Sequence, residues 1–272
     1  MEQQSVTLND VELAYWIRSA NDDGSTPLVL VHGFMGNSRS WNPVVDQLAA
    51  DRPVITFDHR GHGASTNTGV SDTYCFDQLV SDFAALVDHL QLERFHVLGH
   101  SMGGVVAMRY AVDHPERIAS LVPMDTAAAA APDDVNDNVG FMRTGIEIAG
   151  TQGMLALFET INAAIPDLPE LEEFREGLRY DLLAMDPLAF VRFGNELLEY
   201  PSFLDRLAQL TMPATVLVGE NDLGLRDAAQ AMATTIPGAT LSVIPNAAHS
   251  PQIENPAGWL EAVAGHFERQ AS

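Results

Sequence analysis

The sequence predicts an α/β fold: a mostly parallel sheet of eight strands, covered by helices on both faces, with a helical lid inserted after the sixth strand. Short apolar runs alternate with segments of helical periodicity in residues 28–124 and again in residues 213–269. Most of these runs are continuous, as expected of parallel strands buried on both faces. Between the two regions, four helical segments follow one another without a strand, and this break predicts the lid.

The first two strands are expected to form a hairpin. Val6–Leu8 and Glu12–Ile17 alternate apolar and polar side chains on either side of Asn9 and Asp10, which favour a tight turn. The six later strands are apolar runs. In chain order they are expected at Leu28–Val31, Pro53–Phe57, Phe95–Leu98, Ile118–Met124, Pro213–Gly219 and Thr240–Ile244.

The expected helices divide into two groups by their place in the chain. The core helices have apolar side chains at helical spacing, and are expected at Ser40–Ala49, Phe76–Leu90, Met102–Val112, Ala228–Thr235 and Pro256–Arg269. The lid helices are expected at Val139–Ile148, Gly153–Ala163, Leu171–Leu183 and Pro187–Glu199. Residues 1–125 and 208–272 then form the core. Residues 126–207 form a helical cap, which either covers a site or is a purely structural insertion.

The chain carries a strongly negative charge. It has 37 acidic residues and 14 arginines but no lysine, for a formal net charge of −23 in 272 residues. A surface of this charge repels nucleic acid and anionic membranes, and slows the approach of anionic substrates. Two causes are consistent with arginine in place of lysine: a codon bias, and adaptation to high salt.

The sequence gives no sign of export or of a membrane span. Cys75 is the single cysteine, so no intrachain disulfide can form. Met1–Asp10 is polar and unlike a secretory signal, and no apolar run approaches the length that crosses a bilayer. We expect a cytoplasmic monomer or homodimer whose partner is a small molecule rather than nucleic acid or a membrane.

The most informative stretch is Gly99–Gly103, which reads Gly-His-Ser-Met-Gly between a predicted strand and a predicted helix. In this context the pattern is typical of a nucleophile elbow, a tight turn that lifts a serine above the edge of the sheet. The glycines leave room for the turn, and the serine is expected to have strained backbone angles. Ser101 is therefore the candidate nucleophile.

A serine hydroxyl needs a general base, and the base needs an orienting carboxylate. An elbow serine is followed along the chain first by the acid and then by the histidine. Asp222 and His249 supply that order, each in a loop just after a predicted strand. Glu220 and Asp125 also follow strands and compete with Asp222 for the acid position, and a helix cap is the alternative role for Asp222.

Two backbone N–H groups are expected to stabilise the oxyanion that forms during attack. One belongs to Met102, the residue after the nucleophile, and the other to Phe34, in the glycine-bearing loop after Leu28–Val31. His32 is expected to shape that loop, and His100 to be a packed, hydrogen-bonded residue rather than a second base.

The turn at Asp58–Gly63 contains an aspartate, an arginine and two histidines. We interpret it as a braced turn rather than a metal site, because it offers few good ligands. The sequence has no cysteine–histidine spacing typical of zinc and no lysine-bearing phosphate loop. No metal and no cofactor are expected.

Together these motifs make the chain resemble the α/β-hydrolase superfamily over nearly its whole length. The matching segments are His32-Gly33-Phe34, Asp58–Gly63, Gly99–Gly104, Asp222 and His249. They resemble most the lidded branch, which includes carboxylesterases, enol-lactonases, C–C hydrolases, perhydrolases, epoxide hydrolases and haloalkane dehalogenases. The last two carry aspartate at the elbow, so Ser101 implies acyl-enzyme chemistry instead. Phe34-Met35-Gly36-Asn37 departs from the Ser-Gly-Pro-Gly-like run usual in C–C hydrolases.

The resemblance implies a serine carboxylic-ester hydrolase that acts on small or medium uncharged esters or lactones. The alternatives are an enol-lactonase or C–C hydrolase, a cofactor-free perhydrolase, and a ligand receptor on the same fold. Apolar side chains of the lid are expected to line the substrate pocket. The candidates are Phe141, Met142, Phe158 and Phe190.

Overall fold

A computed structural model describes residues 2–19, 24–130 and 137–271. Within them lies an eight-stranded sheet with the strand order β1-β2-β4-β3-β5-β6-β7-β8. The strands are β1 Gln4–Leu8, β2 Val11–Arg18, β3 Leu28–Val31, β4 Val54–Phe57, β5 Phe95–His100, β6 Ile118–Met124, β7 Thr215–Gly219 and β8 Thr240–Ile244. The β1–β2 and β2–β4 pairs are antiparallel and the others parallel. The predicted fold class is confirmed.

The hairpin between β1 and β2 forms at the predicted turn. Asn9 and Asp10 both have positive φ angles, 49° and 63°, and Leu8 pairs with Val11 across the turn. Two central residues in the left-handed region are the geometry of a two-residue turn whose twist matches that of the strands. Asparagine and aspartate tolerate this region better than most residues with a side chain.

Helices cover both faces of the sheet. Buried side chains of α1 and α10, including Trp41 beside α1 and Trp259 in α10, form one core cluster. Buried side chains of α2, α3 and α8 belong to the other cluster. The core helices are α1 Val45–Leu48, α2 Phe76–His89, α3 Met102–Asp113, α8 Leu223–Thr235, α9 Pro251–Glu254 and α10 Pro256–Ala271. No helix in the described ranges is long and apolar enough to cross a membrane.

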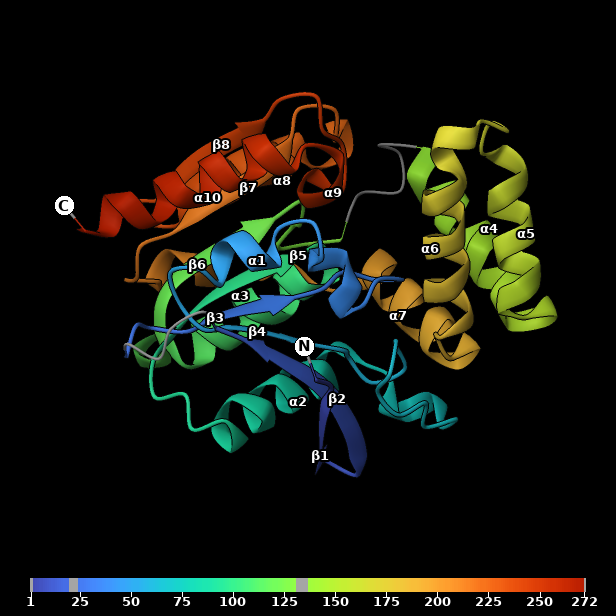
Figure 1. Ribbon diagram of the computed structural model, residues 1–272, viewed down its shortest axis with the longest axis horizontal. Helices are drawn as coiled ribbons and strands as arrows, with labels where there is room; N and C mark the ends of the chain where they lie inside the picture. The colour runs from blue at the N-terminus through green and yellow to red at the C-terminus, as the bar shows by residue number, and fades with distance from the viewer. Residues whose placement is uncertain (1, 20–23, 131–136, 272) are drawn as a thin grey trace.

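Four further helices lie between β6 and β7 in the chain. They are α4 Asp137–Gln152, α5 Met154–Ala164, α6 Glu172–Leu183 and α7 Pro187–Glu199. Figure 1 shows α4, α5 and α6 standing together to one side of the sheet, beyond the ends toward which the parallel strands point, with α7 closer to the core. The cap predicted at residues 126–207 includes residues 131–136, which lie outside the described ranges. The rest of it contains these helices.

The start of α7 is attached to the core. The Asp186 side chain caps the helix by accepting the N–H of Leu188 at 2.9 Å, and Pro187 occupies the first turn. The same carboxylate accepts the hydroxyl of Tyr74 at 2.5 Å, and the Asp186 N–H donates to the carbonyl of Gly61 at 3.0 Å. This buried aspartate fixes the inserted helices to the turn after β4.

The helix predicted at Ser40–Ala49 is wrong as a continuous element. The chain forms a 3₁₀ turn at Ser38–Trp41 and only one α-helical turn at Val45–Leu48. Pro43 explains the break, because it has no N–H to continue the helical hydrogen bonds. The predicted apolar face is nevertheless buried.

The last part of the chain contains two differences from the predicted helices. The helix α8 begins at Leu223, directly after Asp222 as the cap role considered for that residue implies, and not at residue 228, where the apolar period begins. The short helix α9, which follows His249, was not predicted, because its single turn is too brief to produce a hydrophobic period.

Candidate active site

Ser101 occupies the tight turn between β5 and α3. Its φ of 52° and ψ of −120° confirm the predicted strain. A Cβ added to Gly99 would lie 2.3 Å from the carbonyl oxygen of Gly103, and one added to Gly103 would lie 2.3 Å from that of Val31. The Ser101 N–H donates to the Met124 carbonyl at 2.9 Å and anchors the turn to β6. Only glycines allow the backbone to approach this closely.

The structure brings Ser101, His249 and Asp222 into one hydrogen-bonded chain. His249 Nε2 lies 3.1 Å from Ser101 Oγ, and His249 Nδ1 lies 2.7 Å from Asp222 Oδ2. The ionised carboxylate can only accept, so Nδ1 carries a proton and Nε2 is left to accept the serine hydroxyl. The His249 side chain is 49% exposed and that of Asp222 only 9%. The His249 imidazole is therefore accessible to solvent, while the Asp222 carboxylate is shielded from it.

Close backbone contact joins the loops that carry Asp222 and His249. A Cβ at Gly219 would lie 2.0 Å from the carbonyl oxygen of Ala248, so the end of β7 requires glycine. The Asn221 N–H donates to the Ala247 carbonyl at 2.8 Å. The two loops therefore hold Asp222 and His249 in register.

Two side chains fix the backbone around His249. His100 Nε2 lies 2.6 Å from the His249 carbonyl oxygen, to which it donates. The Glu254 carboxylate accepts the N–H groups of Ala248 and Ser250. The packed role expected for His100 agrees with this contact. The sequence analysis did not identify Glu254. Its contact with the His249 loop depends on the short helix α9, which the sequence did not predict.

The two competing carboxylates have other partners. Glu220 Oε2 accepts the N–H of Asn246 at 3.0 Å, and Asp125 Oδ1 accepts the N–H of Gly219 at 2.8 Å. Burial tends to raise the pKa of Asp222, but the hydrogen bond and charge of His249 outweigh it and hold that pKa below its usual range. Asp222 is the carboxylate bonded to His249 Nδ1.

The proposed oxyanion donors lie on either side of the serine. Met102 is the first residue of α3, so its N–H has no partner within the helix. The Phe34 N–H lies in the loop after β3, which a bond from the Gly36 N–H to the Gly33 carbonyl closes at 3.2 Å. Across the described ranges, neither the Met102 nor the Phe34 N–H donates to a protein acceptor.

A separate buried histidine cluster lies beneath the Phe34 loop. His32, His59 and His62 are fully buried, and the rings of His32 and His59 lie 4.4 Å apart. His32 Nε2 accepts the N–H of His59 at 2.9 Å, and its Nδ1 lies 2.8 Å from the Gly33 carbonyl. Burial lowers the pKa of His32 to about 4 and that of His62 to about 3. These imidazoles are neutral and shape the loop, as expected for His32.

The turn that follows β4 is braced by ionic groups. Asp58 accepts the N–H groups of Ser38 and Ala64, each at 2.7 Å. Arg60 forms a buried, bidentate pair with Asp82, through Nε at 2.5 Å and Nη2 at 2.7 Å. Every one of these contacts is structural. The Asp58 bond to Ser38 ties the turn to the segment that follows the Phe34 loop, whereas the Arg60–Asp82 pair ties it to α2.

The candidate pocket residues differ in their surroundings. Phe190 is buried and packs on Phe34, with the ring centroids 4.8 Å apart. Met142 lies beside Gly194 of α7, and Phe158 packs partly against the core. Phe141 is 58% exposed. Among these four candidates, Phe190 is the one with a described contact to the oxyanion loop.

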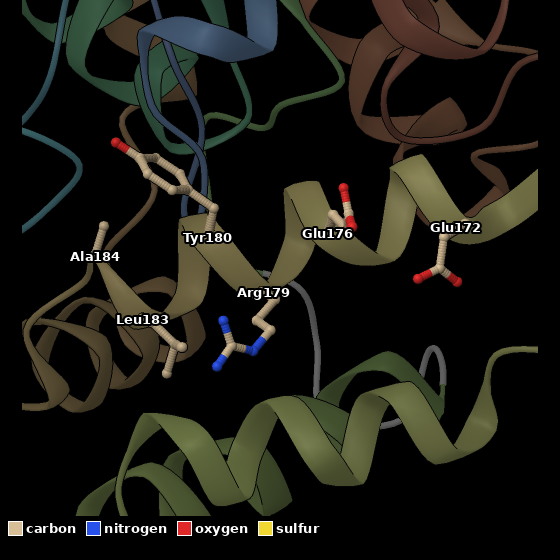
Figure 2. Close-up of a pocket in the computed structure, with 6 residues that line it drawn as sticks. All are labelled: Glu172, Glu176, Arg179, Tyr180, Leu183 and Ala184. Carbon is tan, nitrogen blue, oxygen red and sulfur yellow. The ribbon is translucent and has the colours of Figure 1, made fainter.

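Two hollows described on the surface are not lined by Ser101, Asp222 or His249. One of about 680 Å³ runs along α6, and the other lies beside α2 and α7. Figure 2 shows the first, lined by Glu172, Glu176, Arg179, Tyr180, Leu183 and Ala184. It is an open face of α6 with side chains of both charges, and no nucleophile lines it.

The chain is similar to known proteins over nearly its whole length. A family model described as the alpha/beta hydrolase fold matches residues 26–256. A putative 2-succinyl-6-hydroxy-2,4-cyclohexadiene-1-carboxylate synthase of Bacillus subtilis (strain 168) is 25% identical and covers 93% of each chain. A proline iminopeptidase of Lactobacillus delbrueckii subsp. bulgaricus is 28% identical, covering 88% of each. The structure of a thermophilic esterase from Thermogutta terrifontis is 28% identical, with a TM-score of 0.80 and 99% of each chain covered.

Proposed function

The chain belongs to the alpha/beta hydrolase fold family, and we propose that it hydrolyses small or medium uncharged carboxylic esters or lactones through an acyl-enzyme on Ser101. The observation that carries this proposal is the hydrogen-bonded chain from Ser101 Oγ through His249 to Asp222, at 3.1 and 2.7 Å. It supplies a nucleophile, a base and an orienting carboxylate in the order that acyl transfer requires.

In the first half of the reaction, Ser101 Oγ attacks the ester carbonyl carbon while His249 Nε2 takes the hydroxyl proton. Asp222 holds the imidazole in the correct tautomer and stabilises the imidazolium that forms. The carbonyl oxygen becomes an oxyanion, to which the N–H groups of Met102 and Phe34 donate. His249 then returns its proton to the leaving alcohol, and the ester of Ser101 remains.

The second half repeats these steps with water. His249 takes a proton from a water molecule, whose oxygen attacks the acyl carbon, and the same two N–H groups stabilise the second oxyanion. Collapse of the intermediate releases the carboxylic acid and returns the proton to Ser101. A lactone follows the same path, except that the alcohol and the acid leave as one molecule.

Four observations support an uncharged ester or lactone as the substrate. Ser101 stands at the elbow, where dehalogenases and epoxide hydrolases require aspartate. The net charge of −23 disfavours anionic substrates. The rings of Phe190 and Phe34 meet next to the proposed oxyanion hole and offer an apolar wall. The 28% identity with the Thermogutta terrifontis esterase points the same way.

The alternatives are distinguished by substrate. A peptidase similar to the Lactobacillus relative would cleave L-proline p-nitroanilide, whereas the proposed enzyme would leave it intact. An enol-lactonase, a C–C hydrolase and a perhydrolase would share the acyl-enzyme but prefer other acyl donors or acceptors. A ligand receptor would not turn over any substrate.

The test combines turnover with covalent labelling. Wild-type protein should hydrolyse p-nitrophenyl acetate and butyrate and take up one fluorophosphonate group on Ser101, located by peptide mass spectrometry. Ser101→Ala should abolish labelling and lower kcat by roughly 10⁴-fold or more. Ser81→Ala, which changes an exposed serine of α2, is the matched control and should behave as wild type. Retention of more than about a tenth of kcat by Ser101→Ala would exclude the proposed nucleophile.

A further inference from the structure

Asp125 is a buried carboxyl to which the reaction described above assigns no role. It follows β6, whose neighbours in the sheet are β5, which leads to Ser101, and β7, which leads to Asp222. Its backbone has a φ of 43°, in the left-handed region that residues with a side chain seldom adopt. Backbone strain of this kind concentrates at functional sites. The end of β6 is therefore a constrained position between the nucleophile and the acid.

The side chain of Asp125 is held next to Asp222. Asp125 is 1% exposed, and its Oδ1 accepts the N–H of Gly219 at 2.8 Å. Its Oδ2 is buried and has no hydrogen-bond partner among the residues that the structure describes. One oxygen of Asp125, one of Asp222 and a ring nitrogen of His249 lie within 4.8 Å of one another. A buried carboxyl with one unpartnered oxygen thus lies beside Asp222.

Asp125 and its neighbour Thr126 connect the elbow that carries Ser101 to β7, which leads to Asp222. The Thr126 hydroxyl donates to the Ser101 carbonyl at 2.7 Å, so the residue after Asp125 braces the elbow. The Asp125 N–H donates to the Leu217 carbonyl of β7 at 3.0 Å. A change in the position of Asp125 would therefore alter the distance between the nucleophile and the acid loop.

Two neighbouring carboxylates in a buried site cannot both ionise without strong repulsion. Burial raises the pKa of Asp125 to about 9, and the charge of Asp222 adds to the rise, although the Gly219 N–H opposes it. The charge of Glu254, from α9, acts in the same direction. His249 and His100 favour the ionised form of Asp222. At neutral pH Asp125 is therefore protonated, while Asp222 is ionised.

We propose that Asp125 is a positioning residue of the active site: as a protonated carboxyl it donates a hydrogen bond from Oδ2 to Asp222 and holds Asp222 against His249. Asp125 gives up no proton during the reaction and does not touch the substrate. The inference rests on the proposed function, since it adds a fourth member to the same hydrogen-bonded chain.

Replacement of Asp125 by asparagine or alanine separates this role from a structural one. In Asp125→Asn the amide oxygen still accepts from Gly219 and the amide N–H still donates to Asp222, so kcat at pH 7.5 should stay within about threefold of wild type. Asp125→Ala removes both contacts, and kcat should fall roughly tenfold to a hundredfold with little change in KM. A loss of more than about tenfold in Asp125→Asn would overturn the proposal, because an ionised carboxylate would then be required.

The pH profile gives a signature that a packing role would not produce. In the wild type, kcat should fall as the pH rises through about 9, because ionised Asp125 repels Asp222. Asp125→Asn should lack this alkaline decline. Glu220→Gln, a matched control on the neighbouring loop, should keep it. p-Nitrophenyl acetate serves as the substrate after subtraction of its uncatalysed hydrolysis. An identical alkaline decline in the wild type and Asp125→Asn would overturn the proposal.

Stability measurements test the contact even if the protein hydrolyses no ester. The pKa of Asp125 is raised on folding from about 3.8, so its contribution to the free energy of unfolding is largest below pH 4. That contribution should decline as the pH rises toward about 9. The stability of the wild type relative to Asp125→Asn should follow this decline in urea titrations. Parallel curves would overturn the proposal, whereas absent esterase activity with divergent curves would reject only the proposed function.

Discussion

Two histidine-containing regions follow strands of the same sheet, yet they differ in every property that matters for chemistry. His249 follows β8, is half exposed on its side chain, and has a partner at each ring nitrogen: Asp222 at one and Ser101 at the other. His59 follows β4, is fully buried, and has no partner at either ring nitrogen among the described residues. A histidine after a strand is thus not in itself catalytic.

The contrast shows that partners and solvent access decide what a titratable group does. Burial, with the neighbouring His32 and His62, lowers the pKa of His59 well below its usual value, so it stays neutral and cannot act as a base near pH 7. His249 can take a proton because Asp222 stabilises the imidazolium. Three predictions sharpen this contrast, from the largest expected effect to the smallest.

The largest effect is expected at the acid of the triad. Asp222→Asn should lower kcat roughly 10³–10⁴-fold, because an amide favours the wrong tautomer of His249. Folding should be retained, and kcat from p-nitrophenyl acetate turnover is the measurement. Asp125→Asn, a change of the same kind on the adjacent carboxyl, serves as the comparison and should keep kcat within about threefold of wild type. Equal losses in the two variants would contradict the assignment of the acid.

In the turn after β4, loss of a buried ion pair should lower the free energy of unfolding and leave kcat unchanged. Asp82→Ala leaves Arg60 charged and buried without its partner, and should lower the free energy of unfolding by about 3–5 kcal/mol. The kcat of the remaining folded protein should be unchanged. Asp113→Ala, which breaks the exposed pair with Arg206, should cost less than about 1 kcal/mol. Urea denaturation measures both variants, and similar losses would show that burial is not the deciding factor.

The smallest effect concerns the buried imidazole itself. The pKa of His59 is lowered on folding, so unfolding takes up a proton below pH 6.5, and stability falls as the pH falls. His59→Leu removes that uptake and should flatten the decline by up to about 1.4 kcal/mol per pH unit. Phe57→Leu, a change in the adjacent ring, should lower stability equally at every pH. The measurement is urea denaturation from pH 4.5 to 8, and equal slopes in wild type and His59→Leu would contradict the prediction.

Most of the fold could be predicted because buried strands and amphipathic helices leave periodic patterns. The strands Leu28–Val31, Ile118–Met124 and Thr240–Ile244 match the prediction residue for residue. The failure at Ser40–Ala49 has a local cause, Pro43, whose missing N–H outweighs the apolar period. Single-turn elements such as α9 are too short to show a period at all.

The elbow follows from residue identity alone, since Gly99 and Gly103 leave room for a turn that no other residues permit. The sequence also places an aspartate and a histidine after later strands, where the carboxyl ends of a parallel sheet converge. Which carboxylate reaches His249 depends instead on how the folded loops are placed in space. Asp222, Glu220 and Asp125 all follow strands, and only their positions after folding distinguish them, because a hydrogen bond depends on a few tenths of an ångström that residue order does not encode.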